Sequence, residues 1–195
     1  MLQIQNTKKV LAMSLKSIMA EKPLNKITIR EIVENCGLNR QTFYYHFKDI
    51  YDLLEWMYHE ETIALLSQYH DLGDWQEGAL AILYYVKENA AACECALHSM
   101  GNTQLRKFIH TDFRDIYRQV FDLLSFNLDV DGNFKEFIAN LCVYGAEGYV
   151  IHWLESGMKD SPEQIVEWLS FFIEGNIRQI MERFAKNKEA IKGLS

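Results

Sequence analysis

Proline is almost absent from the chain, which has 195 residues and only two prolines, Pro23 and Pro162. A proline inside a helix removes a backbone hydrogen bond, so its scarcity leaves room for long uninterrupted helices. The sequence also lacks the long alternations of Val, Ile and Thr that are typical of half-buried strands. Helix-forming residues dominate instead, and 49% of the residues are hydrophobic, enough for a sizeable core. We therefore predict an all-α fold.

Cysteines and long apolar segments are also scarce. The four cysteines form no regular disulfide framework; they are Cys36, Cys93, Cys95 and Cys142. We expect no signal peptide, because Lys16 interrupts the first apolar helix, and a reducing cytoplasm is the compartment that these features favour. The longest strongly apolar stretch, residues 137–146, is too short to span a bilayer. We expect no membrane partner.

The acidic charge of the chain is distributed unevenly. The net charge of −7 argues against a protein that binds nucleic acid over its whole surface. Residues 1–50, however, hold eight Lys and Arg against four acidic residues and are net +4, so the remainder carries −11. This asymmetry suggests that the N-terminal part meets an anionic partner. A basic surface that is merely solvated is the alternative.

The first third of the chain has the pattern of four helices. We expect them at about residues 5–21, 28–36, 39–46 and 50–69. Thr28 and Glu31 have the spacing of a capping box at the start of the second helix. Gly37 stands where a left-handed backbone would end that helix. Asn39 and Asp49 are the predicted N-caps of the third and fourth helices.

The second and third helices are short and are joined by a tight turn that contains glycine. With the first helix as a support, they match a helix-turn-helix, whose second helix enters the DNA major groove. Because Phe43 and Phe47 face the core, the polar side chains of the third helix point outward. They are Arg40, Gln41, Thr42, Tyr44, Tyr45 and His46. Arg and Gln pair with the edges of guanine and adenine, so we predict a DNA-binding surface here.

The stretch TIREIVENCGLNRQTFYYHFKDIYDLL resembles the signature of the TetR family of transcriptional regulators, and the resemblance covers roughly residues 7–57. It implies a dimeric DNA-binding regulator that is not an enzyme. The implied base contacts come from Arg40, Gln41, Thr42 and Tyr45. The implied phosphate contacts come from Thr28, Tyr44, His46 and Lys48. The alternatives are that Tyr45 packs on the first helix and that His46 is an ordinary surface residue.

Two positions depart from the family pattern. Ile50 stands where many members have a lysine that contacts phosphate, and KPLNK at residues 22–26 stands where many have a glycine in the turn. This variant is most similar to a subgroup that includes the DhaS-type activator of dihydroxyacetone kinase operons. In that subgroup a protein can be the effector. The expected partners are double-stranded DNA with a palindromic operator, a second copy of the chain, and an unknown small-molecule or protein effector.

Beyond a DNA-binding domain of residues 1–52, we expect residues 53–195 to form an effector-binding and dimerisation domain. Its predicted helices span about residues 75–88, 90–99, 103–126, 134–156 and 162–185. The last helix carries more apolar surface than one core needs, and the resemblance implies that the two final helices pair with those of a second copy. The predicted interface residues are Gly145, Gly148, Leu169, Phe172, Ile173, Ile177 and Ile180. A thick monomeric core is the alternative.

Several side chains of this larger region are candidates for an effector pocket, with ordinary packing as the alternative for each. They are Trp56, Tyr84, His98, Met100, Phe108, Tyr117, Tyr144 and Trp153. The segment CECALH at 93–98 contains metal-ligand residue types, but Cys93 and Cys95 do not face each other on a helix. We predict no metal or cofactor. No nucleophile–base pair stands out, and a helical interaction or small-molecule-binding module is the alternative function.

Overall fold

The structure of the chain is a computed structural model that describes residues 2–66, 75–99, 121–122 and 125–192. Every regular element in those residues is a helix, which confirms the predicted all-α fold. None of these helices is both long and apolar enough to cross a membrane. Most of the helix expected at 103–126 lies outside the described residues. The chain divides into two compact units, Met1–Gln68 with Tyr85–Phe108 and Tyr69–Tyr84 with Ile109–Ser195.

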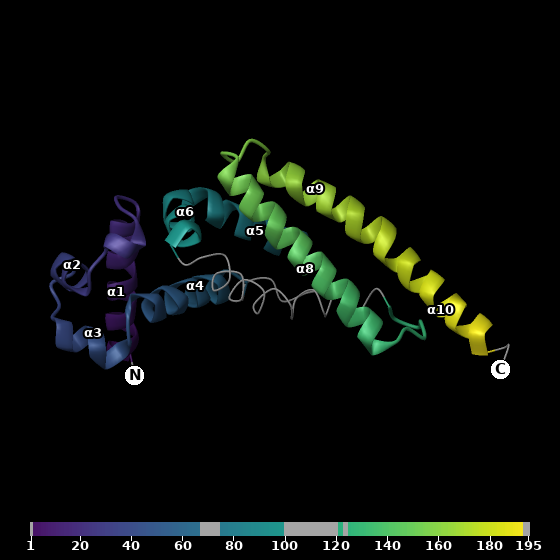
Figure 1. Cartoon of the computed structure of the whole chain (residues 1–195), viewed down its shortest axis with the longest axis horizontal. Helices are drawn as coiled ribbons and strands as arrows, with labels where there is room; N and C mark the ends of the chain where they lie inside the picture. The colour runs from purple at the N-terminus through teal and green to yellow at the C-terminus, as the bar shows by residue number, and fades with distance from the viewer. Residues whose placement is uncertain (1, 67–74, 100–120, 123–124, 193–195) are drawn as a thin grey trace. The chain divides into compact units, whose positions relative to one another are not determined.

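The first unit contains the N-terminal helices together with helices from the middle of the chain (Figure 1). Its elements are α1 (Leu2–Met19), the 3-10 turn η1 (Leu24–Lys26), α2 (Ile29–Asn35), α3 (Arg40–His46), α4 (Ile50–Leu66), the end of α5 (Trp75–Glu88) and α6 (Ala90–Ser99). One buried core joins them, from Leu15 of α1 through Met57 of α4 to Ala96 of α6. This unit is larger than the expected DNA-binding domain of residues 1–52, whose boundary stays a prediction.

Three helices of the first unit, α2, α3 and α4, begin at the caps that the sequence predicts. The Thr28 hydroxyl accepts the backbone N–H of Glu31 at 3.3 Å, and the Glu31 carboxylate accepts the backbone N–H of Thr28 at 2.9 Å. Asn39 caps α3 and Asp49 caps α4, each accepting the N–H three residues on, at 2.8 and 2.9 Å. Caps satisfy backbone donors that have no partner inside the helix. The starting residues of α2, α3 and α4 are therefore fixed locally.

The turn between α2 and α3 depends on one glycine. Gly37 has a φ of +70°, in the left-handed region that side chains with a Cβ disfavour. Its N–H donates to Glu34 O at 3.3 Å, and the N–H of Leu38 donates to Val33 O at 2.8 Å. This pair of bonds is the Schellman motif that closes a helix. The turn therefore sets where α3 starts.

The second unit is built around two long helical segments. Its described elements are the first part of α5, α8 (Gly132–Glu155), α9 (Pro162–Phe172), the π-helical turn η3 (Ile173–Ile177) and α10 (Arg178–Lys192). α8 runs alongside the α9–α10 segment, in the opposite direction (Figure 1). Ile138 of α8 packs with Ile177 of η3 and Met181 of α10 in a shared core. The ring of Phe134 stacks on that of Phe184 with centroids 3.9 Å apart.

The single helix expected at 162–185 is interrupted by η3. Its start is as expected, because Ser161 accepts the N–H of Gln164 at 3.2 Å and Pro162 follows it. The interruption contains Gly175 and Asn176, two weak helix formers. The Asn176 amide donates to the carbonyl of Phe172 at 3.2 Å. Apolar residues four apart, such as Ile173 and Ile177, fit both an α-helix and a π-helical turn. The apolar spacing in the sequence therefore did not reveal the π-helical turn.

Candidate nucleic-acid interface

Two phenylalanines anchor α3 and so decide which of its side chains face solvent. Phe43 is fully buried and Phe47, the residue that follows α3, is 3% exposed. Their ring centroids lie 6.0 Å apart, and Phe47 also lies 5.7 Å from the ring of Trp56 on α4. α3 has seven residues, about two turns. Fixing one side of so short a helix turns its remaining side chains outward.

The four residues expected to contact bases lie on this outward side. Arg40, Gln41 and Tyr45 are exposed, and Thr42 is half-buried. Tyr45 is 75% exposed, which argues against the alternative in which its ring packs on α1. The Thr42 hydroxyl donates to Asn39 Oδ1 at 3.0 Å. The hydroxyl is thus already hydrogen-bonded, and the methyl group is the other end of the side chain.

Arg40 is held by its neighbour one turn along the helix. Its guanidinium carbon lies 6.0 Å from the centroid of the Tyr44 ring, and one guanidinium nitrogen lies 3.5 Å from the Tyr44 hydroxyl. The Tyr44 ring in turn meets the buried Phe43 ring edge-on, with centroids 5.7 Å apart. A stacked guanidinium loses less conformational freedom when it binds. Arg40 is thus partly ordered before any contact with DNA.

The residues expected to contact phosphate include Thr28 and Lys48, both exposed. The Thr28 hydroxyl also donates to Glu31 Oε2 at 2.8 Å, and Lys22 pairs with the same carboxylate. Hydrogen bonds from Lys22 and Thr28 lower the pKa of Glu31 to about 2. Glu31 therefore remains an anion beside Thr28, with Lys22 balancing its charge. The backbone N–H of Lys48 donates to Asp52 Oδ2 at 2.8 Å, which fixes the start of α4.

His46 lies half-buried at the end of α3, near a lysine that the sequence did not single out. Its pKa is lowered from the usual value, first by partial burial and then by the positive charge of Lys8. The ammonium nitrogen of Lys8 lies 5.4 Å from the ring centroids of both Phe47 and Trp56. Both effects favour the neutral form of the His46 imidazole in the DNA-free protein. No local spacing in the sequence predicts these contacts of Lys8, because Phe47 and Trp56 lie far from it along the chain.

The candidates for an effector pocket belong to both units of the chain, and the pocket stays a prediction. Trp56 packs on Phe47, while Trp153 is buried and its indole N–H donates to the carbonyl of Asp160 at 2.9 Å. The side chains of His98, Tyr84 and Tyr144 are exposed. Met100, Phe108 and Tyr117 lie outside the described residues. A cavity of about 200 Å³ near the start of α8 is lined by none of these candidates.

The two cysteines of α6, Cys93 and Cys95, pack against the core of the first unit. Cys93 and Cys95 are half-buried, and the Cys95 thiol lies 3.5 Å from the carbonyl oxygen of Lys22. Burial raises the pKa of Cys93 to about 11, so its thiol stays protonated at neutral pH. Across the described part of the chain, no three His, Cys, Asp or Glu side chains cluster as metal ligands.

The residues expected at a dimer interface fall into two groups. Ile173 and Ile177 are 3% and 2% exposed and pack inside their own subunit, with Ile180 half-buried on the same core. Their apolar stripe therefore serves the intrachain contact with α8. Phe172 is exposed and Leu169 is half-buried.

Gly145 and Gly148 border open space, because a Cβ added at either would meet no atom within 4 Å. Large apolar side chains are exposed on the same helix and on α9. They are Phe137, Leu141 and Tyr144 on α8, and Trp168, Phe171 and Phe172 on α9. We call these six residues the apolar face. Several large apolar side chains left exposed on neighbouring helices are typical of an interaction site.

Two family models match the sequence. Residues 16–57 match the model described as bacterial regulatory proteins, tetR family, and residues 73–175 match the model described as transcriptional regulator C-terminal region. The chain is also 30% identical over 83 residues to the HTH-type dhaKLM operon transcriptional activator DhaS of Lactococcus lactis subsp. lactis (strain IL1403). That alignment covers 43% of this chain and 44% of the relative, less than half of either protein.

Solved structures of regulators share the fold. The dihydroxyacetone kinase operon activator DhaS aligns with a TM-score of 0.70 and 20% identity, over 92% of this chain and 98% of that one. A TetR transcriptional regulator from Streptococcus agalactiae 2603V aligns with a TM-score of 0.59 and 21% identity, over 85% and 92%. NalD is described as the secondary repressor of the MexAB-OprM multidrug efflux pump in Pseudomonas aeruginosa. It aligns with a TM-score of 0.60 and 16% identity, over 86% of this chain and 94% of that one. At these identities the likeness concerns the fold alone.

Proposed function

Because these matches place the chain in the TetR family of bacterial transcriptional regulators, we propose that it acts as a homodimer that binds a palindromic operator through α3 and responds to an effector at its C-terminal region. The family membership confirms the resemblance stated from the sequence. The models and relatives that match are transcription regulators rather than enzymes.

One observation supports the DNA-binding role above all others. α3 buries Phe43 and exposes Arg40, Gln41 and Tyr45 along a helix whose start is capped by Asn39. The α3 N-terminus is the part of a recognition helix that meets base edges. The proposal assigns base contacts to Arg40, Gln41, Thr42 and Tyr45. It assigns phosphate contacts to Thr28, Tyr44, His46 and Lys48.

The apolar face supports the proposed dimer. Phe172, which the sequence predicted at the interface, is exposed on the apolar face, as is Phe171, which is 85% exposed. Gly145 and Gly148 would allow the backbone of a partner helix to approach α8 closely. A two-fold dimer places two copies of α3 on two half-sites, so operator symmetry follows from protein symmetry. In this proposal Ile173 and Ile177 contribute indirectly, by holding α8 against the α9–α10 segment.

The similarity to DhaS suggests where a first operator can be sought. That relative is named for activating the dhaKLM operon, and the aligned region includes less than half of it. We therefore propose an operon for dihydroxyacetone kinase as the first DNA target to test. The effector, a small molecule or a protein, would act in the bacterial cytoplasm, where transcription takes place.

Binding selection from fragmented genomic DNA tests the proposal. Purified protein should retain a small set of fragments that share an inverted repeat, with half-site centres about 34–36 Å apart or at a multiple of that spacing. Retention should weaken steeply with salt, because phosphate contacts release counterions. Retention of all fragments alike, or of none, would refute site-specific binding.

A further inference from the structure

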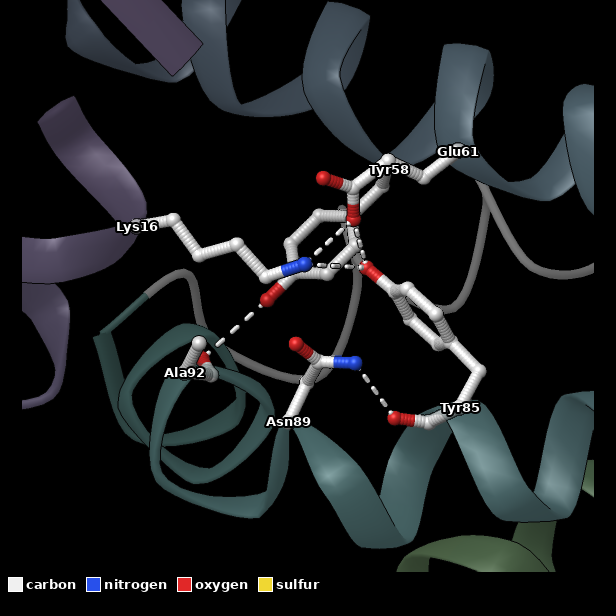
Figure 2. Close-up of polar contacts among 6 residues, drawn as sticks. All are labelled: Lys16, Tyr58, Glu61, Tyr85, Asn89 and Ala92. Carbon is white, nitrogen blue, oxygen red and sulfur yellow. Dashed lines mark hydrogen bonds and ion pairs between the residues drawn. The ribbon is translucent and has the colours of Figure 1, made fainter. Parts of the chain in front are cut away.

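A polar cluster joins α1 to α4 and α5 inside the first unit (Figure 2). Lys16 of α1 lies 2.7 Å from Glu61 Oε2 on α4. The hydroxyl of Tyr85 on α5 donates to the same oxygen. The Lys16 ammonium also lies 4.9 Å from the centroid of the Tyr85 ring and 3.5 Å from its hydroxyl. One carboxylate oxygen thus receives donors from two other helices.

The helices around Glu61 form a fixed frame. The buried Tyr58, one turn before Glu61, donates its hydroxyl to the carbonyl of Ala92 on α6 at 3.1 Å. At the junction of α5 and α6, the Asn89 amide donates to the carbonyl of Tyr85 at 2.7 Å. Figure 2 shows these bonds around the Lys16–Glu61 pair. Glu61 therefore belongs to a frame made of α4, the end of α5 and α6.

On the other side, α1 is tied to the helix-turn-helix. Ser14, two residues before Lys16, donates its buried hydroxyl to the carbonyl of Ile32 on α2 at 2.7 Å. The amide of Asn35, the last residue of α2, donates to the Ser14 hydroxyl at 3.0 Å. A continuous series of contacts therefore runs from α2 through α1 to Glu61.

We infer that Glu61 is a positioning residue for DNA binding, which holds α1, and through it α2 and α3, in one orientation against the frame of α4, α5 and α6. The inference rests on the proposed DNA-binding function. Glu61 itself carries a negative charge, so it is unsuited to contact phosphate directly.

The chemistry of the contact favours an orienting role. Lys16 and Glu61 have side chains that are 23% and 32% exposed, and ion pairs of this kind add little net stability. Apolar contacts between α1 and α4 would tolerate a slight rotation of α1. The ion pair of Lys16 and Glu61, with the Tyr85 hydroxyl bonded to the same oxygen, is satisfied in only one orientation of α1. Burial and the adjacent carboxylate raise the pKa of Tyr85 well above its usual range, so its hydroxyl remains a donor.

Glu61→Gln tests the inference, because glutamine keeps the size and can still accept from Tyr85 but loses the charge that pairs with Lys16. In full-length protein, we expect the affinity for the selected operator to fall about tenfold. Affinity for shuffled DNA should stay unchanged, since it depends on phosphate contacts and not on the relative placement of two copies of α3. Glu60→Gln removes the same charge from the adjacent position and should leave both affinities unchanged.

A charge swap separates orientation from general destabilisation. Lys16→Glu combined with Glu61→Lys restores an ion pair of opposite polarity and should recover most of the operator affinity that either single change loses. Circular dichroism melting shows that each variant is folded at the assay temperature. A double variant no better than the single ones would overturn the inference. So would an unchanged operator affinity in Glu61→Gln, even with a lower melting temperature. If the wild type shows no site-specific binding, the proposed function fails, and this inference fails with it.

Discussion

At the scale of single residues, some side chains of α3 are ordered by contacts with neighbouring residues, and others extend into solvent. Arg40 rests on Tyr44, and the Thr42 hydroxyl is bonded to Asn39. Gln41 is exposed on the same face. An ordered side chain loses less entropy on binding than an extended one. In the proposed complex Arg40 is therefore the better anchor, whereas Gln41 would become ordered only on contact with a base.

Gln41→Ala and Lys48→Ala separate base reading from phosphate binding. Loss of Gln41 should cost about 1–3 kcal/mol at the selected operator and relax the preference at one position of each half-site. Loss of Lys48 should weaken binding to all sequences alike and make the dependence on salt shallower by about one counterion per subunit. Fluorescence anisotropy with operator and shuffled DNA across a salt series measures both effects. An unchanged base preference in Gln41→Ala would place the recognition surface elsewhere.

The charge of Lys8 should control the titration of His46. Partial burial and Lys8 both lower the pKa of His46, so Lys8→Met should raise that pKa part of the way back toward the usual value of about 6.5. A histidine with a lowered pKa binds protons more readily in the unfolded chain. Its contribution to stability is therefore lost as the pH falls below the unfolded pKa. NMR titration of His46 in both proteins measures the shift, and equal pKa values would contradict the role given to Lys8.

At the scale of elements, the helix-turn-helix owes its geometry to short-range contacts. The capping box of Thr28 and Glu31, the turn at Gly37 and the cap at Asn39 all lie within twelve consecutive residues. Each cap contributes about 1 kcal/mol to helix stability. Together they fix the start of α2, its end and the start of α3 without help from distant residues.

Gly37→Val should disturb this turn more than Gly37→Asn. A φ of +70° costs a residue with a Cβ about 1–2 kcal/mol, and a β-branched residue more, whereas asparagine tolerates it best among the alternatives. A Cβ at this position would meet no atom within 4 Å, so the cost is one of backbone conformation and not of crowding. We expect the valine variant to lose operator binding while it keeps its oligomeric state, and the asparagine variant to retain most of both. Gel-shift titration and sedimentation provide the measurements. Equal affinities for the two variants would refute the turn argument.

Features that depend on residues close together in the sequence could be predicted from it, and contacts between distant segments could not. The caps, Gly37 and the anchoring Phe43 and Phe47 were predictable because each depends on neighbours within a few residues. The contacts of Lys8 and Glu61 were not, because each joins helices that are distant in sequence. The π-helical turn was also missed, since apolar spacing alone does not distinguish it from an α-helix. The residues proposed to contact DNA remain predictions that rest on exposure and family pattern.

At the scale of the whole molecule, the proposed function depends on the assembly of two copies. A helix of seven residues reaches few base pairs, so a useful specificity requires two half-sites read together. The apolar face on α8 and α9 is the surface that we propose for this pairing. The buried stripe of Ile173 and Ile177 has the different role of keeping that surface in shape.

Phe172→Glu and Ile173→Glu distinguish these two roles at adjacent positions. Phe172 is 53% exposed, so a glutamate there should leave the subunit folded but dissociate the dimer. Ile173 is buried, and an unpaired charge at its position should lower the free energy of unfolding by several kcal/mol. Sedimentation velocity and thermal melting compare the variants. A Phe172→Glu protein that remains dimeric at micromolar concentration would exclude this part of the apolar face from the interface.

The division of labour within α3 also has an evolutionary consequence. Phe43 is the one buried residue of the seven that make up the helix, and the others face solvent wholly or in part. Mutations at the outward positions can therefore accumulate after gene duplication with little penalty to folding. Under the proposed function, two descendants of one ancestral gene would in this way acquire separate target promoters while they inherit the same scaffold. The same freedom suits laboratory selection, in which a library randomised at Arg40, Gln41 and Tyr45 would yield regulators for new promoters from a single stable parent.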